Sequence, residues 1–320
     1  MILAFYLIFI NLPVFAHDET SWATDYKAFA YTKRALTFSP ENSSRRIQGQ
    51  FEKILIDPQF LKTKLSEFTG AATTVIDGQV VTIRERESIE GRNLARKFLA
   101  REFGQLGFAL SEHTYNTGKN FIAEKKGREP QVLILSSHLD SVGNAGANDD
   151  GIGTIGALAI AQAIANRDFK YTLRFVGFDE EELGLVGARA YVRALQNKDK
   201  LLGDIQMEMM ATNSRGDGGF HVIDCDRRDS KGLSQKVMDA IAVNRIPLKR
   251  IPACTHRSDH SAFWNSNLAA IVLSENFFGG DEDPCYHSSC DIVDDRMNFD
   301  YAANITSAVA SAVISILSGN

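Results

Sequence analysis

Residues Val132–Asp140 read VLILSSHLD, an apolar run that changes abruptly to polar side chains. Four consecutive apolar residues of this kind are typical of a buried strand, which we expect to end at Ser137. The later segment from Gly151 to Ala165 is rich in Ala, Gly and Ile, which favours a helix packed closely against a sheet. A second apolar run over Leu173–Phe178 predicts another strand. Strand, helix and strand in this order indicate a parallel β-α-β unit.

The same alternation continues on both sides of this unit. Upstream, Asp77-Gly78 between two β-branched runs predicts a hairpin, and apolar residues at helical spacing from Leu94 stop before Gly107. We expect further helices around Phe60–Phe68, Leu183–Leu195, Leu233–Ile241 and Ile305–Ile316, and further strands over Asp204–Met210 and Ala269–Leu273. This pattern predicts an α/β domain, a three-layer αβα sandwich with a mostly parallel, mixed central sheet.

The N-terminal residues differ from the rest of the chain. Residues 1–16 are almost wholly apolar and end in Val14-Phe15-Ala16, which predicts a signal peptide although no Lys or Arg precedes the run. A hydrophobic anchor and a mistaken start are the alternatives. We interpret residues 17–70 as an N-terminal extension or a propeptide, and residues 71–320 as a single domain. We therefore expect a secreted or periplasmic protein with no membrane association after the signal is removed.

Composition and cysteine content narrow the class of protein further. The chain has 320 residues with a formal net charge of −5, and no stripe of Lys and Arg stands out, so we expect no nucleic-acid partner. The four cysteines allow three pairings, and four reduced thiols are the alternative. In an exported chain we favour disulfides. Cys285 and Cys290 are close enough to close a short loop, which leaves Cys225 with Cys254.

Histidines and carboxylates follow the predicted strands at the points where the strands end. His138 and Asp140 come directly after the first strand, Asp149 precedes the small-residue helix, and the run Asp179–Glu182 follows the second strand. Glu208 lies on or at the end of the next one. Each feature alone is more typical of a capped turn or a solvated helix start. Their joint placement after successive strands is what indicates a site, because ligands bind at the carboxyl ends of strands in open α/β sheets.

These side chains have the chemistry of a metal site. Zinc takes imidazole and carboxylate ligands, and two ions about 3.5–4 Å apart need one carboxylate that bridges them. The candidate metal ligands are His138, Asp149, Glu182, Glu208 and His287. Glu181 is placed to act as a general base. Asp140 can orient the His138 ring through its far nitrogen.

Several ordered motifs make the chain resemble a known family. They are Ser137-His138-Leu139-Asp140-Ser141, Gly146-Ala147-Asn148-Asp149-Asp150-Gly151, Glu181-Glu182-Leu183-Gly184-Leu185-Val186-Gly187, Arg257-Ser258-Asp259-His260 and Tyr286-His287-Ser288. From about Glu87 to the C-terminus, the chain resembles the secreted two-zinc aminopeptidases, a family that also includes plasma glutamate carboxypeptidase-like enzymes and glutaminyl cyclases. The resemblance implies a zinc-exopeptidase-like fold, with an early strand at Asn120-Phe121-Ile122-Ala123.

The resemblance also implies a role for each matching residue. Asp149 looks like the bridging ligand, with His138 and Glu208 completing one zinc site and Glu182 and His287 completing the other. Glu181 looks like the general base and Asp140 the partner of His138. A cis peptide bond between Asp149 and Asp150 is expected. Tyr286 matches a tyrosine that helps to stabilise the oxyanion in some relatives, although a packing role is equally compatible with the sequence.

Two departures from the family pattern bear on the site. Many related aminopeptidases have Asp where this chain has Glu208, which leaves the geometry of the site and the substrate class open. His260 is a rival of His287, and we favour His287 because His260 is not the usual ligand. Asp259 is interpreted either as a residue that contacts the metal ligands but not the metal, or as an acidic residue of a local turn.

The expected activity is that of a two-zinc exopeptidase. We expect a metallo-aminopeptidase that acts on a peptide or small protein substrate with a free N-terminus. A carboxypeptidase or dipeptidase on the same site is one alternative, and a glutaminyl cyclase with one zinc is another. A binding ectodomain that has lost its metals belongs to a different class, and the complete set of candidate ligands argues against it.

Overall fold

The computed structural model describes residues 50–196 and 200–320, all of them within one compact unit. The predicted signal peptide and most of the predicted extension lie outside these residues. The centre of the unit is an eight-stranded sheet in the order β3-β4-β6-β5-β7-β10-β8-β9. The bounds are β3 Ala109–Thr114, β4 Lys119–Lys125, β5 Val132–His138, β6 Thr172–Phe178, β7 Leu201–Glu208, β8 Gly219–Ile223, β9 Lys249–Arg250 and β10 Ala270–Glu275.

The middle of this sheet is parallel. β6, β5, β7 and β10 run parallel to one another. β4 pairs antiparallel with β3 and β6, β8 pairs antiparallel with β10, and β9 pairs parallel with β8. The predicted hairpin forms a separate two-stranded sheet, β1 (Thr74–Ile76) and β2 (Gln79–Val81). The mixed, largely parallel sheet is therefore confirmed.

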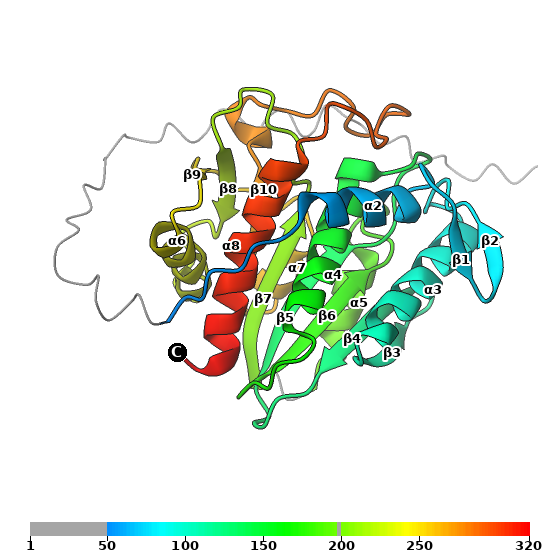
Figure 1. Ribbon diagram of the computed structural model, residues 1–320. Coiled ribbons are helices and arrows are strands. Elements are labelled where there is room, and N and C mark those ends of the chain that lie inside the picture. The colour runs from blue at the N-terminus through cyan, green and yellow to red at the C-terminus, as the bar shows by residue number, and fades with distance from the viewer. Residues whose placement is uncertain (1–49, 197–199) are drawn as a thin grey trace, which may run out of the picture. The chain divides into compact units, whose positions relative to one another are not determined.

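Helices cover both faces of the sheet, as expected for three layers (Figure 1). One large core contains buried residues of α2 (Pro58–Phe68), α3 (Ile89–Gln105), α4 (Ile152–Ile164), α6 (Lys231–Asn244) and α8 (Phe299–Ser318). A second core contains those of α5 (Val186–Ala194) and α7 (His260–Trp264). Figure 1 shows α4 and α8 in front of the sheet and α5 and α7 behind it. The three-layer αβα arrangement is confirmed.

Helix α8 is apolar because it is a core helix. Among the described residues it is the one helix long and apolar enough to cross a membrane, and 83% of that window is buried within the protein. Buried residues on nearly all sides of a helix are expected where it packs between a sheet and other helices. Asn298 caps its N-terminus by accepting a hydrogen bond from the Tyr301 amide.

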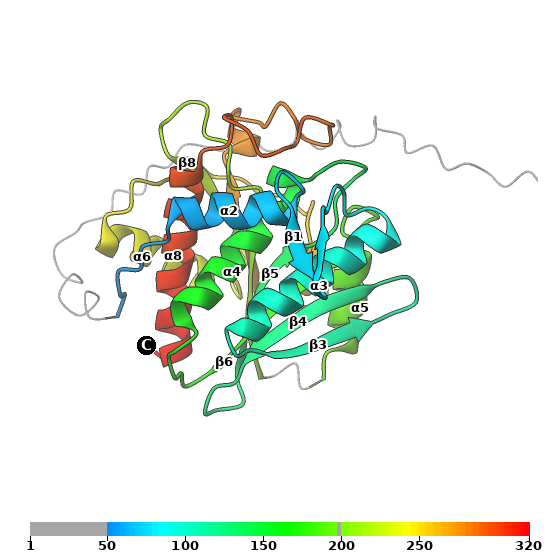
Figure 2. The ribbon, with the colours of Figure 1, turned by 45° about the vertical axis from the view of Figure 1, so that its right-hand side comes forward.

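The described residues of the predicted extension share one core with the helices of the domain. Phe51, Leu61, Leu65 and Phe68 are buried in the large core, and α2 packs on α4 and α8, across which it lies in Figure 2. Helix α2 begins after Asp57, whose side chain accepts the Gln59 amide, with a proline at the first helical position. The described part of the predicted extension is thus integral to the domain.

Some predicted boundaries were wrong, and three strands were not anticipated. The helix expected from Leu183 starts only at Val186, because the preceding residues form turns in which Leu185 has a positive φ of 60°. β7 lies a few residues earlier than the strand predicted over Asp204–Met210. β3 was missed because it is a mostly exposed edge strand, and β9 because it has only two residues. β8 was missed because His221 interrupts its short apolar run.

Both disulfides form as favoured. Cys225 is bonded to Cys254 and Cys285 to Cys290. The second bridge closes the short loop that contains Tyr286 and His287.

Candidate metal centre

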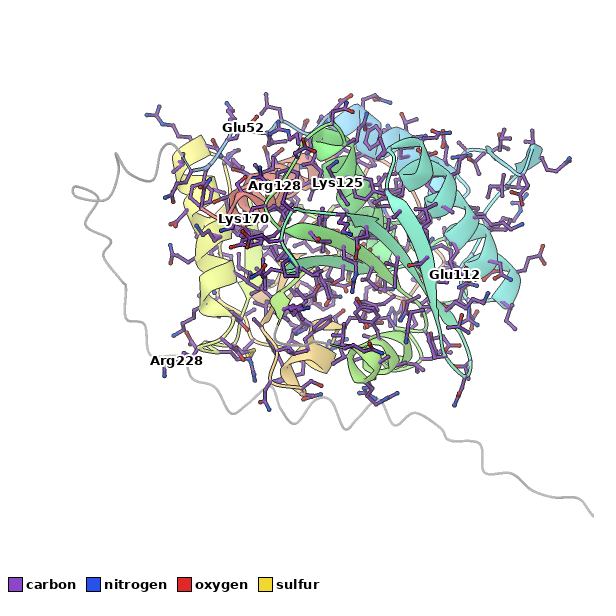
Figure 3. All side chains as sticks on the ribbon, turned by 90° about the horizontal axis from the view of Figure 1, so that it is seen from below. Glu52, Glu112, Lys125, Arg128, Lys170 and Arg228 are labelled. Atoms are coloured by element: carbon purple, nitrogen blue, oxygen red, sulfur yellow. A yellow bond between two sulfur atoms is a disulfide. The ribbon has the colours of Figure 1, made fainter. Side chains whose placement is uncertain are left out.

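The strand order predicts a ligand site at the carboxyl ends of the parallel strands. β5 connects through α4 to β6 on one side, and β6 connects through α5 to β7 on the other side of β5. The chain thus reverses its direction across the sheet at β5, which is where ligands bind in open α/β sheets. Lys125, Arg128 and Lys170 lie away from it, near the amino ends of β5 and β6, as seen from below in Figure 3.

Asp149 lies between two histidines that are far apart in the sequence. Its Oδ1 is 3.0 Å from His138 Nε2, and its Oδ2 is 3.2 Å from His287 Nε2. Each histidine also faces one glutamate: Glu208 Oε1 is 3.4 Å from His138 Nε2, and Glu182 Oε2 is 3.1 Å from His287 Nε2. The five predicted ligands therefore form two groups that share one carboxylate.

The backbone around Asp149 places this carboxylate. The peptide bond between Asp149 and Asp150 is cis, as expected. Asp291 accepts hydrogen bonds from the amides of Asn148 (2.7 Å) and Asp149 (3.1 Å). Asp150 also lies within ligand distance of His138 and Glu208, but it accepts the amides of Gly153 and Met209. We therefore regard Asp150 as structural.

Asp140 connects the two loops that carry ligands. Its Oδ1 is 3.4 Å from His138 Nδ1. Its two oxygens accept the amides of Glu181 (3.2 Å) and Glu182 (3.1 Å). One buried carboxylate thus lies beside a histidine ring and accepts the backbone amides of two glutamates.

The loop that carries Glu181 is held by a network of ion pairs that the sequence did not indicate. The two residues before it, Asp179 and Glu180, are buried and form ion pairs with Arg92 at 3.2 and 2.8 Å, and Asp179 also pairs with Arg96 at 2.8 Å. Both arginines belong to α3, so this helix anchors the loop after β6. Burial raises the pKa of Glu181, as do the nearby carboxylates of Asp259 and Glu208.

The predicted ligands shift one another's pKa values. Burial alone would raise the pKa of Asp149, but hydrogen bonds from His138 and His287 outweigh it and hold that pKa below its usual range. Conversely, burial would lower the pKa of His287, but its hydrogen bonds to Asp149 and Glu182 raise it to about 10. Burial raises the pKa of Glu182, and the neighbouring Asp149 carboxylate adds to this effect. A positive charge close to these buried carboxylates therefore stabilises their ionised forms.

Tyr286 and His260 differ in their relation to this centre. The ring of Tyr286 stacks on that of His287 at 3.8 Å between centroids, and its hydroxyl accepts a hydrogen bond from Arg257 Nη2 at 3.1 Å. His260 instead pairs its Nε2 with the carbonyl of Thr255 at 3.0 Å, and it is not part of either ligand group. Ser258, two residues before it, donates a hydrogen bond to Glu208 Oε2 at 2.6 Å.

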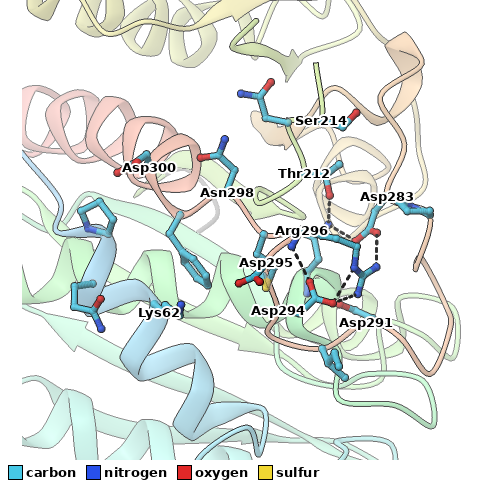
Figure 4. A pocket seen from close by; sticks show the side chains of 18 residues that line it. Lys62, Thr212, Ser214, Asp283, Asp291, Asp294, Asp295, Arg296, Asn298 and Asp300 are labelled. Carbon is cyan, nitrogen blue, oxygen red and sulfur yellow. Dashed lines mark hydrogen bonds and ion pairs between the residues drawn. The ribbon is translucent and has the colours of Figure 1, made fainter. Parts of the chain in front are cut away.

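A pocket adjoins the turn that carries Asp149. It has a volume of about 640 Å³, and Asn148 and Asp291 form part of its wall. Figure 4 shows Arg296 between Asp283 and Asp294, with Arg296 Nη2 2.6 Å from Asp294 Oδ2. These contacts support the loop that follows the Cys285–Cys290 disulfide.

Comparison with known proteins identifies the family. Residues 120–313, more than half of the chain, match the model of peptidase family M28. The chain therefore belongs to peptidase family M28.

Curated relatives agree with this assignment. The chain is 32% identical over 213 residues to leupeptin-inactivating enzyme 1 of Streptomyces exfoliatus, a match that covers 58% of this chain and 46% of the relative. It is 30% identical over 232 residues to leucine aminopeptidase 2 of Arthroderma otae, covering 64% of this chain and 46% of that protein. The chain thus spans about half the length of the curated relatives it matches.

Solved structures support the fold. The LapA aminopeptidase of Legionella pneumophila superposes with a TM-score of 0.69 at 18% identity, covering 90% of this chain and 78% of that one. BSAP, a zinc aminopeptidase from Bacillus subtilis, gives a TM-score of 0.56 at 24% identity, covering 61% and 49%. At these identities the likeness shows the fold alone.

Proposed function

We propose that this protein is a metal-dependent aminopeptidase that removes residues from the free N-terminus of peptides or small proteins by means of two zinc ions. The observation that carries the proposal is the position of Asp149, whose two oxygens face the two histidines. The peptidase family of the chain and the name of one relative, leucine aminopeptidase 2, support the reaction class.

The side chains present fit two zinc ions. His138 Nε2 faces carboxylate oxygens of both Asp149 and Glu208, and Glu182 Oε1 is buried without a hydrogen-bond partner among the described residues. Imidazole nitrogen and carboxylate oxygen are the donors that zinc prefers in catalytic sites. His138, Asp149 and Glu208 would hold one ion, and His287, Asp149 and Glu182 the other. When bound, the ions would polarise the scissile carbonyl and acidify water at neutral pH.

The other groups of the site have roles that follow from their positions. Glu181 lies beside the ligand Glu182, and its backbone is anchored on Asp140, so it is placed to take a proton from the attacking water and deliver it to the leaving amine. A pKa raised by burial suits a carboxylate for both steps. The Tyr286 hydroxyl would donate a hydrogen bond to the carbonyl oxygen as it becomes negative. Asp140 would keep the His138 ring in place.

The two disulfides also indicate the kind of compartment in which the protein acts. Disulfides persist in oxidising compartments and are rare in reducing ones. We therefore propose that the protein acts outside the cytoplasm, in agreement with the predicted signal peptide.

A peptide mixture analysed by mass spectrometry tests the reaction. It would contain free and N-acetylated forms of the same sequences and one peptide that begins with Gln, incubated with and without a zinc chelator. We expect stepwise loss of N-terminal residues from the free peptides alone, stopped by the chelator.

Each other outcome supports a different activity. Trimming from the C-terminus would indicate a carboxypeptidase, and loss of ammonia from the Gln peptide a cyclase. No change in any peptide, together with no bound metal, would contradict the proposal and indicate a binding protein.

A further inference from the structure

Arg86, between β2 and α3, is a fully buried arginine with no carboxylate at ion-pair distance in the described part of the chain. Its side chain is 0% exposed. Burial lowers its pKa. A buried charge without a paired partner is costly, so the structure must stabilise this guanidinium by other means.

The guanidinium hydrogen bonds to a single loop. Arg86 Nε donates to the carbonyl of Leu139 at 2.7 Å, Nη1 donates to that of Ala145, and Nη2 donates to that of Gly146 at 2.9 Å. The Arg86 amide donates to Ser141 Oγ at 3.0 Å. The loop over residues 139–146 is the segment that links His138 to the turn of Asp149. Arg86 therefore binds both ends of this loop at once.

The loop is shaped closely around the guanidinium. Gly146 has a φ of 57°, and a Cβ atom there would lie 2.7 Å from Arg86 Nη2. Its carbonyl also accepts the amide of Gly151 at 3.0 Å, so Arg86 is tied through one atom to the turn that contains Asp149. On the other side, the guanidinium lies over the ring of Phe68 at 4.7 Å. These contacts leave Arg86 little freedom to move.

Charge and geometry at Arg86 act on a metal site in opposite directions. The carboxylates of Asp291, Asp140, Asp150 and Asp149 interact favourably with its positive charge. A cation beside these groups weakens their attraction for a metal ion, so the charge alone disfavours metal binding. The three carbonyl contacts have the opposite effect, because they hold His138 and Asp149 at the spacing in which both face one point.

We infer that Arg86 is a positioning residue that sets the distance between His138 and Asp149, and that its geometric effect outweighs its charge. The inference rests on the proposed function, because it assumes that these residues bind zinc. Arg86 itself touches neither metal nor substrate.

Zinc affinity of Arg86 variants tests this inference. Arg86→Met removes the hydrogen bonds and the charge, and Arg86→Lys keeps the charge but loses the planar fork. Arg101→Met is a matched control, because Arg101 also lies over a phenylalanine ring, that of Phe98 at 4.9 Å, and donates to a backbone carbonyl, that of Val75. The full chain is measured by competition with a zinc chelator, by cobalt(II) absorption and by circular dichroism.

We expect Arg86→Met to fold and to bind zinc about 10- to 100-fold more weakly, the range seen when groups that orient metal ligands are removed. Its cobalt(II) spectrum should change. Arg86→Lys should recover part of the affinity, and Arg101→Met should match the wild type in both measurements.

Three results would overturn the inference. Suppose that Arg86→Met folds and binds zinc as tightly as wild type, or more tightly. Then either the charge of Arg86 affects zinc binding more than its hydrogen bonds do, or the loop keeps its shape without those hydrogen bonds. If Arg86→Met does not fold, folded Arg86→Lys with wild-type affinity and spectrum would have the same meaning. Failure of both variants to fold would assign Arg86 to the fold alone. A wild-type protein that binds no zinc would instead contradict the proposed function.

Discussion

At the scale of single residues, two buried carboxylates outside the set of predicted ligands hold the backbone of the loops that carry those ligands. Asp140 accepts the amides of Glu181 and Glu182, and Asp291 accepts those of Asn148 and Asp149. Hydrogen bonds from amides stabilise the charged form of a carboxylate and fix its direction. The ligands can therefore be arranged before any metal binds.

Glu181→Gln is predicted to separate metal binding from turnover. Glutamine has nearly the same size but cannot take a proton from water, so turnover should fall by at least about 100-fold, while zinc content is unchanged. Peptide hydrolysis and elemental analysis of the same sample measure the two effects. Glu129→Gln, at an exposed position, is the control. Near-normal turnover with a full metal load would rule out Glu181 as the general base.

At the scale of elements, loops carry the ligands and neighbouring elements brace them. The Cys285–Cys290 bridge closes the loop of Tyr286 and His287, and Arg296 contacts both the Sγ of Cys285 and the carbonyl of Cys290. The side chain of His287 is 41% exposed, and its ring stacks on Tyr286 of the same loop. We therefore expect the disulfide to restrain the position of this predicted ligand.

Removing that disulfide should weaken metal retention. The double variant Cys285→Ser, Cys290→Ser is expected to lower zinc affinity by about 10-fold, because an unrestrained loop lets His287 leave its position. The variant Cys225→Ser, Cys254→Ser removes the other bridge, which does not enclose a predicted ligand, and should keep the affinity. Chelator competition measures both. Equal effects of the two double variants would contradict the role of the loop.

Helix α2 is an element whose contribution can be tested separately. Leu65 is fully buried in the large core, so Leu65→Ala should lower the free energy of unfolding by about 2–5 kcal/mol. Leu55→Ala changes the same residue type where the side chain is 78% exposed, and should have little effect. Urea unfolding compares them. If Leu65→Ala behaves like Leu55→Ala, the segment before residue 71 is dispensable for the domain.

At the scale of the whole molecule, the sheet buries acids that lie outside the ligand groups. Asp204 on β7 is fully buried, accepts a hydrogen bond from Ser136 at 2.8 Å, and has a second oxygen without a partner among the described residues. Burial raises its pKa to about 8. In the unfolded chain the pKa of an aspartate is about 4. Between about pH 4 and about pH 8, the folded state therefore binds one proton more than the unfolded state at this residue.

This difference predicts that stability falls as pH rises from about 4 to 8. The stabilising proton is fully bound below the unfolded pKa and is lost as pH passes the folded value. Asp204→Asn should make the decline less steep, because the amide does not ionise. Denaturant unfolding of the metal-free protein at several pH values measures the slope, with Asp168→Asn, at an exposed position, as control. A slope identical in all three proteins would show that Asp204 does not titrate in this range.

The sequence by itself determined the layers and the chemical groups. Apolar periodicity is a local property, so β5, β6 and α4 could be predicted close to their observed bounds, whereas α8 begins six residues before the predicted helix. The His, Asp and Glu residues that follow the predicted strands are also a local property of the sequence, and they indicated a zinc site. Local patterns were insufficient for the exposed edge strand β3 and for the start of α5, where tertiary contacts and turns override propensity.

Only the tertiary structure decided which groups meet. That Asp149 faces His138 and His287 together depends on strand order and on a disulfide loop far along the chain. Arg86, Arg92 and Asp291 carry no motif that singles them out, yet they hold the loops of the centre through contacts across large sequence separations. Such contacts form only when packing brings distant segments together, which is why their function cannot be found in local sequence.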